Sequence, residues 1–371
     1  YTAGVHLRAG SSLNSGGGDI TLRGQNLNTS TGAMVFGVFG KQTTLDSGTG
    51  KITITGLATG SGSANAQAIS SYGNFNIRSA NTTAQAISIV GDATGVTGTA
   101  TSLGINLNGV IQATGSGGSI YVLGKSSAVT GYSLGNGIGG SVVASSGSIT
   151  LIGDNASSTL DGLNIGGLTL GANASTSVTS SSSNITLKGN QFGLNNTTVF
   201  NTSGTLSVLS LDGSNSFGSA QTFGNFWSFG SNLSGLTIGR STNTVNITVL
   251  NSLGISGPIS IYGGNVYLAG NIASTGGGNV LLSGTGDVVV TGNVSTSGTF
   301  SATAGAAKSF VMGMNYATGV GSTITANGGV TLSAGTSYLA GNVTTVGGAI
   351  SVTGNVQVAN LSADPVANPV T

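Results

Sequence analysis

Short runs of alternating apolar and polar residues, each followed by glycine, recur along the whole chain. Ile-Thr-Leu-Arg-Gly at residues 20–24 returns as Ile-Thr-Ile-Thr-Gly at 52–56 and as Ile-Thr-Leu-Ile-Gly at 149–153. Alternation with a period of two places the apolar side chains on one face and the Thr and Ser side chains on the other. Each run has the length of a strand, and glycine stands where a helix would have to continue. The pattern therefore predicts an all-β protein of many short strands. Further copies of the run lie at residues 120–124, 185–189, 266–270, 280–284 and 350–354.

Two arrangements suit short strands at this spacing, an antiparallel meander or a coil whose successive turns pair in parallel. Hairpins favour Asn-Gly or Asp-Gly in two-residue loops, and Asp161-Gly162 and Asp212-Gly213 are present. Most corners instead read Gly-Asn-Val, as at residues 292–294 and 341–343. Asparagine at a repeated corner can form an amide ladder between successive turns. The corners thus favour a parallel β-solenoid, with the glycines after each run at corners or at close backbone approaches.

The spacing of the runs indicates how the solenoid is organised. Gaps of 32, 29 and 36 residues separate Gly24 from Gly56, Gly124 from Gly153, and Gly153 from Gly189, which leaves room for one or two coils plus a loop at about 20–25 residues per coil. We expect residues 1–235 to form a solenoid with irregular loops and insertions, and residues 236–361 to continue the same single elongated rod more regularly. Residues 362–371, with Pro365 and Pro369, are expected to form a tail or linker.

The alternation also predicts which side chains point into the core. Met34, Phe36 and Phe39 are expected to be buried in the first half of the chain. The predicted inward residues of the second half are Ile255, Ile259, Ile261, Val266, Leu268, Val280, Leu282, Val288, Val290 and Val294.

Composition separates this chain from a disordered linker. Of 371 residues, 67 are glycine and only 5% are charged, but 38% are hydrophobic and the mean hydropathy is +0.29, so the chain can bury enough apolar surface to fold. The nine Lys and Arg residues are scattered, which argues against nucleic-acid binding and against attachment to a membrane surface. Cysteine is absent, and no apolar stretch is long enough for a membrane-spanning helix. The chain begins at Tyr1 without a signal-peptide pattern, so we expect a processed or excised piece of a longer precursor.

The sequence resembles the filamentous haemagglutinin-like and autotransporter-type surface proteins of Gram-negative bacteria. The resemblance is carried by Ser-Gly-Gly-Gly-Asp-Ile-Thr-Leu-Arg-Gly at residues 15–24 and by residues 236–266. It implies a right-handed parallel β-helix, export to the cell surface or medium, and an adhesive or matrix-building role. An Asn-Pro-Asn-Gly motif, which the secretion region of that family usually carries, is absent from the sequence.

Catalytic chemistry finds little support in the residue types present. All eight acidic residues are Asp, and no two of them fall within four residues, whereas polysaccharide hydrolysis or calcium binding needs clustered carboxylates. His6 is the only histidine and is expected to be a solvated or capping residue. We therefore predict no enzyme, no metal and no cofactor. A lyase or hydrolase whose distant Asp residues meet on adjacent coils stays open as the weaker alternative.

One aromatic cluster could bind a ligand. Aromatic faces in a polar loop can stack on sugar rings, so a host or matrix glycan is a candidate partner. The alternative is a loop that folds over the solenoid and buries its own rings. An ice-binding array of Thr-x-Thr pairs is disfavoured, because Thr gives way to Tyr, Leu, Arg or Lys in equivalent places. The residues of the cluster are Phe217, Phe223, Phe226, Trp227 and Phe229.

The ends of a parallel coil expose unpaired backbone groups. No amphipathic capping helix is evident near Tyr1 or Thr371, and the low charge opposes association only weakly. Through its solenoid ends the chain is therefore expected to join other copies of itself, or further repeats of the same polypeptide, as a homo-oligomer or fibre. The sequence predicts an extracellular structural or adhesive solenoid, with a glycan-binding solenoid as the alternative.

Overall fold

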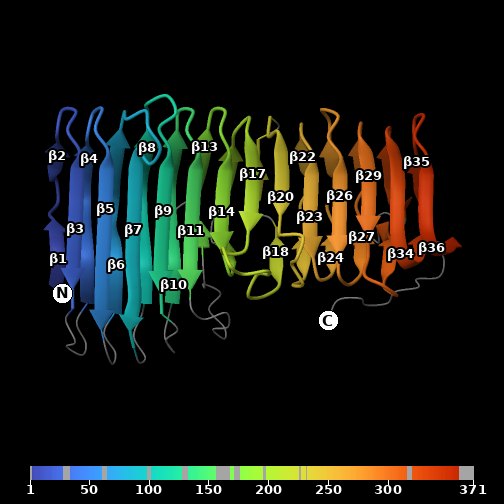
Figure 1. Cartoon of the computed structure of the whole chain (residues 1–371), viewed down its shortest axis with the longest axis horizontal. Helices are drawn as coiled ribbons and strands as arrows, with labels where there is room; N and C mark the ends of the chain where they lie inside the picture. Colours follow the sequence, from blue (N-terminus) through green and yellow to red (C-terminus); the bar gives the residue numbers. More distant parts are fainter. Residues whose placement is uncertain are drawn as a thin grey trace. The chain divides into compact units, whose positions relative to one another are not determined.

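The computed structural model describes residues 2–27, 34–60, 65–97, 102–127, 133–155, 168–170, 176–194, 198–224, 227–230, 232–315 and 320–358. It divides into two compact units. Unit 1 comprises residues 1–214 and 226–230, and unit 2 comprises residues 215–225 and 231–371. Among the described strands one pairing is antiparallel, between β31 (Met314–Asn315) and β32 (Val320–Gly321). The expected all-β parallel solenoid is confirmed in each unit (Figure 1).

Unit 1 consists of two facing parallel sheets. The first sheet contains β1 (Thr2–Leu7), β2 (Ser12–Asn14), β4 (Met34–Asp46), β6 (Asn65–Ser79), β8 (Ser102–Ala113), β10 (Ser133–Ala144), β12 (Leu168–Leu170), β13 (Thr176–Ser180), β15 (Phe192–Leu194), β16 (Thr198–Asn201) and β19 (Trp227–Phe229). The second sheet contains β3 (Ile20–Asn26), β5 (Ile52–Gly60), β7 (Ile87–Val96), β9 (Ile120–Ser126), β11 (Ile149–Asn155), β14 (Ile185–Gly189) and β17 (Thr205–Leu209).

From β3 to β14, each turn of the coil in unit 1 takes up one whole interval between the repeated runs. Ile20 pairs with Ile52, and Ile52 pairs with Ile87, so these coils take up 32 and then 35 residues. The expectation of about 20–25 residues per coil is therefore wrong for the coils from β3 to β14, which take 29 to 36 residues, whereas the coil from Ile185 to Leu206 takes 21. The reason is the length of the opposing strands: β4 has 13 residues and β6 has 15.

The glycine that ends the run in β3, β5 and β7 marks a place where the two sheets of unit 1 come into backbone contact. A Cβ on Gly56 would lie 2.1 Å from the carbonyl oxygen of Ala68, and one on Gly91 would lie 2.2 Å from that of Gly104. Both glycines lie inside strands, β5 and β7. Of the two roles expected for these glycines, close backbone approach is therefore the one the structure supports here, and a corner is not.

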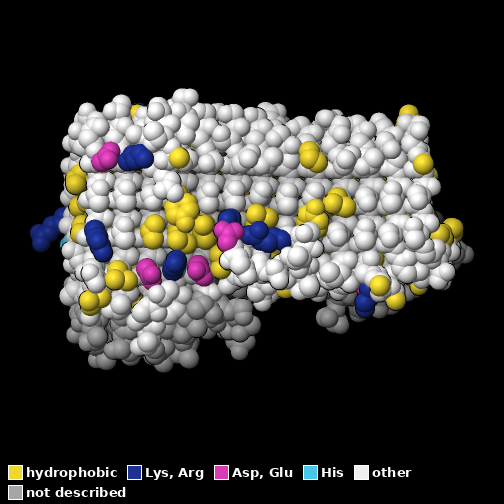
Figure 2. Space-filling view, viewed as in Figure 1, with side chains coloured by type: hydrophobic (Ala, Val, Ile, Leu, Met, Phe, Trp, Pro, Cys, Tyr) yellow, Lys and Arg dark blue, Asp and Glu magenta, His cyan; other side chains and the backbone are white. Residues whose placement is uncertain are grey.

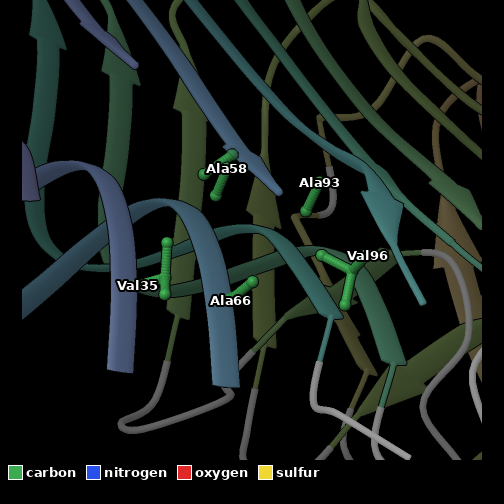
Figure 3. Packing of buried hydrophobic residues seen from close by; sticks show 6 residues of the cluster. Val35, Ala58, Ala66, Ala93 and Val96 are labelled. Carbon is green, nitrogen blue, oxygen red and sulfur yellow. The ribbon is translucent and has the colours of Figure 1, made fainter. Parts of the chain in front are cut away.

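A cluster of small buried side chains lies next to this glycine contact, at the start of β4 and β6 and near the end of β5 and β7. Figure 3 shows Val35 and Ala66 of one sheet facing Ala58 and Ala93 of the other, with Val96 beside them. These five residues are at most 1% exposed. Small side chains fit here because the sheets are already in contact at the neighbouring glycines.

Unit 2 has a shorter coil with three faces. The first face contains β20 (Gly235–Ile238), β23 (Ile259–Gly263), β26 (Val280–Gly284), β29 (Thr299–Thr303), and the first parts of β34 (Gly329–Leu339) and β36 (Ile350–Val358). The second contains β18 (Gln221–Phe223), β21 (Ile247–Val249), β24 (Val266–Leu268), β27 (Val288–Val290), β30 (Ser309–Met312), and the later parts of β34 and β36. The third contains β22 (Leu253–Ile255), β25 (Ile272–Ser274), β28 (Val294–Thr296), β33 (Thr323–Ala326) and β35 (Asn342–Thr344).

The expected asparagine ladder is present in unit 2, with the backbone as its partner. Asn246 Oδ1 accepts a hydrogen bond from the backbone N–H of Asn265 at 2.8 Å, and Asn265 Oδ1 accepts one from that of Asp287 at 2.8 Å. Asp287 Oδ1 continues the ladder to the N–H of Ser309 at 2.7 Å. Each side chain thus satisfies a backbone donor of the next coil at a corner, where no strand partner is available.

Most of the predicted core is confirmed. The ten inward residues predicted between Ile255 and Val294 are all at most 1% exposed, and Phe36 and Phe39 are buried with their ring centroids 4.5 Å apart. The prediction for Met34 is wrong, because this side chain is 43% exposed. Met34 is the first residue of β4, and the strand places its neighbour Val35 in the interior instead.

Candidate functional site

On the outward face of the second sheet of unit 1, one column of side chains is Thr or Ser in every strand but one, and the neighbouring columns are mixed. Every second residue of each strand points outward, and the parallel register stacks these positions into two complete columns and a shorter third one. The first column reads Thr21, Thr53, Ser88, Tyr121, Thr150, Thr186 and Ser207. Tyr121 on β9 is the departure from this hydroxyl column.

The second column is mixed along its whole length. It reads Arg23, Thr55, Val90, Leu123, Ile152, Lys188 and Leu209. Leu123 and Ile152 lie next to each other across β9 and β11, and both are half-buried. In the third column, Lys125 lies between Asp92 and Asp154. The space-filling view shows apolar side chains gathered over β7 to β11, bordered by Lys or Arg and by Asp (Figure 2).

These residues line a hollow of about 440 Å³, which we call the outer hollow. Tyr121, Leu123 and Ile152 form its apolar part, and Lys125, Asp154, Lys188 and Asp212 contribute its charges. Asn155, Asn190, Leu211 and Ser214 complete the lining. All of the lining residues belong to unit 1.

One wall of the outer hollow is a turn that follows β17. Lys188 Nζ on β14 lies 2.6 Å from Asp212 Oδ2 and joins this turn to the sheet. Ser210 Oγ donates a hydrogen bond to the carbonyl oxygen of Ser214 at 2.9 Å, and Gly213 adopts φ +85°, a conformation that favours glycine. The turn is therefore held in a defined position beside Tyr121 and Leu123.

The electrostatics of the outer hollow act on the tyrosine. Burial raises the pKa of the Tyr121 phenol above its ordinary value of 10.0, and the nearby carboxylate of Asp212 raises the pKa further. The phenol is therefore protonated at neutral pH and can donate a hydrogen bond. Two Lys and two Asp side chains balance, so the hollow presents no net charge.

The aromatic residues predicted to contact a glycan are largely interior. Trp227 in unit 1 is 5% exposed, and its ring centroid lies 5.0 Å from that of Phe200 and 5.8 Å from that of Phe229. Phe217 and Phe223 in unit 2 are buried. Phe226 lies outside the described residues. Of the four described rings in the cluster, Phe229 is the one that is half-buried, so the burial favours the alternative in which the cluster packs inside.

The remaining candidates do not converge on a catalytic centre in the parts of the chain that are described. His6 is half-buried with its ring 5.3 Å from that of Phe39. No group of three or more His, Cys, Asp or Glu side chains that could hold a metal ion is found among these residues. Asp154 and Asp212, distant in the sequence, both line the outer hollow. Within the same ranges, no helical segment has the length and apolar character of a transmembrane helix.

Comparison with known proteins gives no relative to draw on. No protein-family model matches the chain, and neither the curated proteins nor the solved structures contain a match.

Proposed function

We propose that this protein is an extracellular structural or adhesive solenoid of a bacterial surface or secreted protein, which assembles end to end with further copies of itself. The proposal draws on the resemblance to filamentous haemagglutinin-like surface proteins and on the solenoid architecture. The surface is built from hydroxyl, amide and backbone groups and carries little charge, so like-charge repulsion opposes association weakly.

One observation carries the proposal: the apolar interior columns of unit 2 reach the surface at β36. Val330 is 1% exposed, whereas Ile350, its partner in the next coil, is 51% exposed. Val356 and Val358 are 49% and 83% exposed on the same strand. In the described residues β36 is paired along one edge, to β34, and within these residues its other edge offers backbone groups and apolar side chains to a further coil.

The proposed occupant of this edge is β3 of a second copy. Ile20, Leu22 and Gly24 on β3 match Ile350, Val352 and Gly354 on β36 position for position. In the described residues β3 is also paired along one edge, to β5. A parallel β3–β36 contact would continue the apolar columns of one copy into the next.

Assembly is tested with Val358→Lys, which adds a charge to the exposed edge without altering the interior of the coil. Val110→Lys places the same charge on an exposed residue of β8 and serves as the control. Sedimentation velocity of the wild type should show oligomers that increase with concentration, and electron microscopy should show filaments. Val358→Lys should need at least about tenfold more protein for the same oligomer fraction. A wild type that stays monomeric at every concentration, or an equal effect of Val110→Lys, would overturn the proposal.

A surface or secreted location is tested on the source cells. Antibodies against the folded chain should label intact cells or detect the chain in the medium. Labelling that appears only after the cells are broken open would contradict this part of the proposal.

A further inference from the structure

At the outer hollow the first column of the unit 1 sheet face changes from hydroxyls to an aromatic ring, beside two apolar side chains of the second column. Tyr121 replaces the Thr or Ser of its column, and Leu123 and Ile152 stand next to it across two coils. Their presence beneath a turn held by the Lys188–Asp212 ion pair indicates a built site.

We infer that the outer hollow is a binding site for a neutral saccharide, with the ring of Tyr121 and the side chains of Leu123 and Ile152 contacting the C–H face of one sugar ring. This inference rests on the proposed adhesive function and gives it a ligand. The volume of about 440 Å³ lies in the range of roughly 300–1,000 Å³ that is usual for small-ligand sites.

The polar groups around the apolar floor select the class of ligand. Lys125, Asp154 and the amide of Asn190 offer both donors and acceptors at the edge of the hollow, which suits hydroxyl groups. Asn190 is itself positioned by a hydrogen bond from its Nδ2 to the carbonyl oxygen of Asn155 at 2.9 Å. The phenol of Tyr121 adds a further donor.

Charge balance argues against an anionic ligand. Lys188 is already engaged by Asp212 at 2.6 Å, and Lys125 lies between two aspartates in the register of the sheet. A sulfated or carboxylated sugar would have to approach these carboxylates as well as the lysines, which removes the advantage of its charge. A neutral sugar meets no such repulsion.

The architecture supplies matched variants for the test. Tyr121→Thr introduces the residue that its own column carries at Thr53, Thr150 and Thr186, so the coil should fold unchanged. Leu123→Thr introduces the residue that the second column carries at Thr55. It is the second variant if Tyr121→Thr does not fold. Tyr72→Thr removes a tyrosine that is 67% exposed elsewhere in unit 1 and serves as the control.

The experiment is saturation-transfer NMR followed by calorimetric titration with D-galactose, D-mannose, N-acetyl-D-glucosamine and their β-linked disaccharides, and with a heparin-derived tetrasaccharide as the anionic probe. At least one neutral sugar should bind the wild type, Tyr121→Thr should weaken binding at least about tenfold, and Tyr72→Thr should change it less than about twofold. The inference is wrong if no neutral sugar binds, if the sulfated probe binds more tightly than all of them, or if the control weakens binding as much. Each titration is repeated with Val358→Lys, so that loss of assembly and loss of sugar binding are read separately.

Discussion

The two units build parallel coils with very different amounts of chain. Ile20, Ile52 and Ile87 of unit 1 stack at intervals of 32 and 35 residues, whereas Ile259, Val280 and Phe300 of unit 2 stack at intervals of 21 and 20. The long coil is flattened, with two sheets that touch at a glycine column and enclose small side chains beyond it. The short coil has three faces around a single apolar interior, with asparagine ladders at its corners. The same five-residue run therefore serves two cross-sections, and the residues opposite the run decide which one forms.

The largest expected difference between the two units concerns the glycine that ends the run. Alanine at Gly91 of unit 1 would place Cβ 2.2 Å from the backbone oxygen of Gly104, and the two sheets would have to separate. We expect Gly91→Ala to lose about 3 kcal/mol or more of unfolding free energy, or to prevent folding. Urea unfolding followed by circular dichroism measures the loss, with limited proteolysis for a variant that does not fold.

Gly284 of unit 2 is the matched position. Its nearest neighbours, Gly264 O and Val288 Cγ2, lie 3.0 and 3.1 Å from the added Cβ, and Ala304 already occupies the corresponding place after Thr303 in the next coil. Gly284→Ala should therefore cost less than about 1 kcal/mol. Equal losses in the two units would refute the idea that only the flattened coil depends on this glycine.

The sequence predicted unit 2 more fully than unit 1, for a physical reason. Strands with one face inside and one outside alternate cleanly, and this is why the inward residues from Ile255 to Val294 could be named in advance. In β4, residues 35–40 are buried on both faces, so the alternation disappears and the strand is hidden among glycines and alanines. The intervals of 29 to 36 residues were visible, but without these long strands they could not be recognised as single coils.

The residues that form the outer hollow stood out in the sequence, but they were interpreted only as evidence against a different kind of surface. Replacement of Thr by Tyr or Leu in equivalent runs was evidence against an ice-binding array, which uses the same positions. Only the register of the sheet reveals that Tyr121, Leu123 and Ile152 are neighbours. The turn that carries Asp212 could not be placed over them from local pattern alone. The aromatic cluster was easier to notice because its rings are close in sequence, but Phe217, Phe223 and Trp227 are buried.

A smaller loss of stability is expected from substitutions at the corners of the coil. Asn265→Ala removes the acceptor that satisfies the N–H of Asp287 at 2.8 Å, and it should cost about 1–2 kcal/mol. Asn265→Asp keeps an acceptor oxygen, as Asp287 does in the next coil, and should retain most of the stability. Hydroxyls also serve at a corner of unit 1, where Ser47 Oγ and Ser79 Oγ both donate to the carbonyl oxygen of Gly50, at 2.6 and 2.7 Å.

Thermal unfolding of both asparagine variants at pH 7 measures the contribution of the ladder. If Asn265→Ala and Asn265→Asp lose the same stability, the hydrogen bond to Asp287 is not what the side chain contributes, and the ladder would not distinguish the corners of unit 2.

The smallest effect concerns the outer face and changes a pKa more than it changes stability. Burial and the carboxylate of Asp212 both raise the pKa of Tyr121, so its phenol should ionise above pH 10.0, after ordinary tyrosines. Because the folded state holds this proton more tightly than the unfolded state, the associated stability is present below the unfolded pKa and is lost as the pH rises through the folded one.

Absorbance at the tyrosinate band during alkaline titration, as the difference between wild type and Tyr121→Thr, isolates this group. Asp212→Asn should lower the pKa of Tyr121 without returning it fully to the ordinary value, because burial is the larger cause. An unchanged titration in Asp212→Asn would mean that the turn after β17 does not lie against Tyr121 in solution, and the outer hollow would then lack the wall on which its proposed selectivity depends.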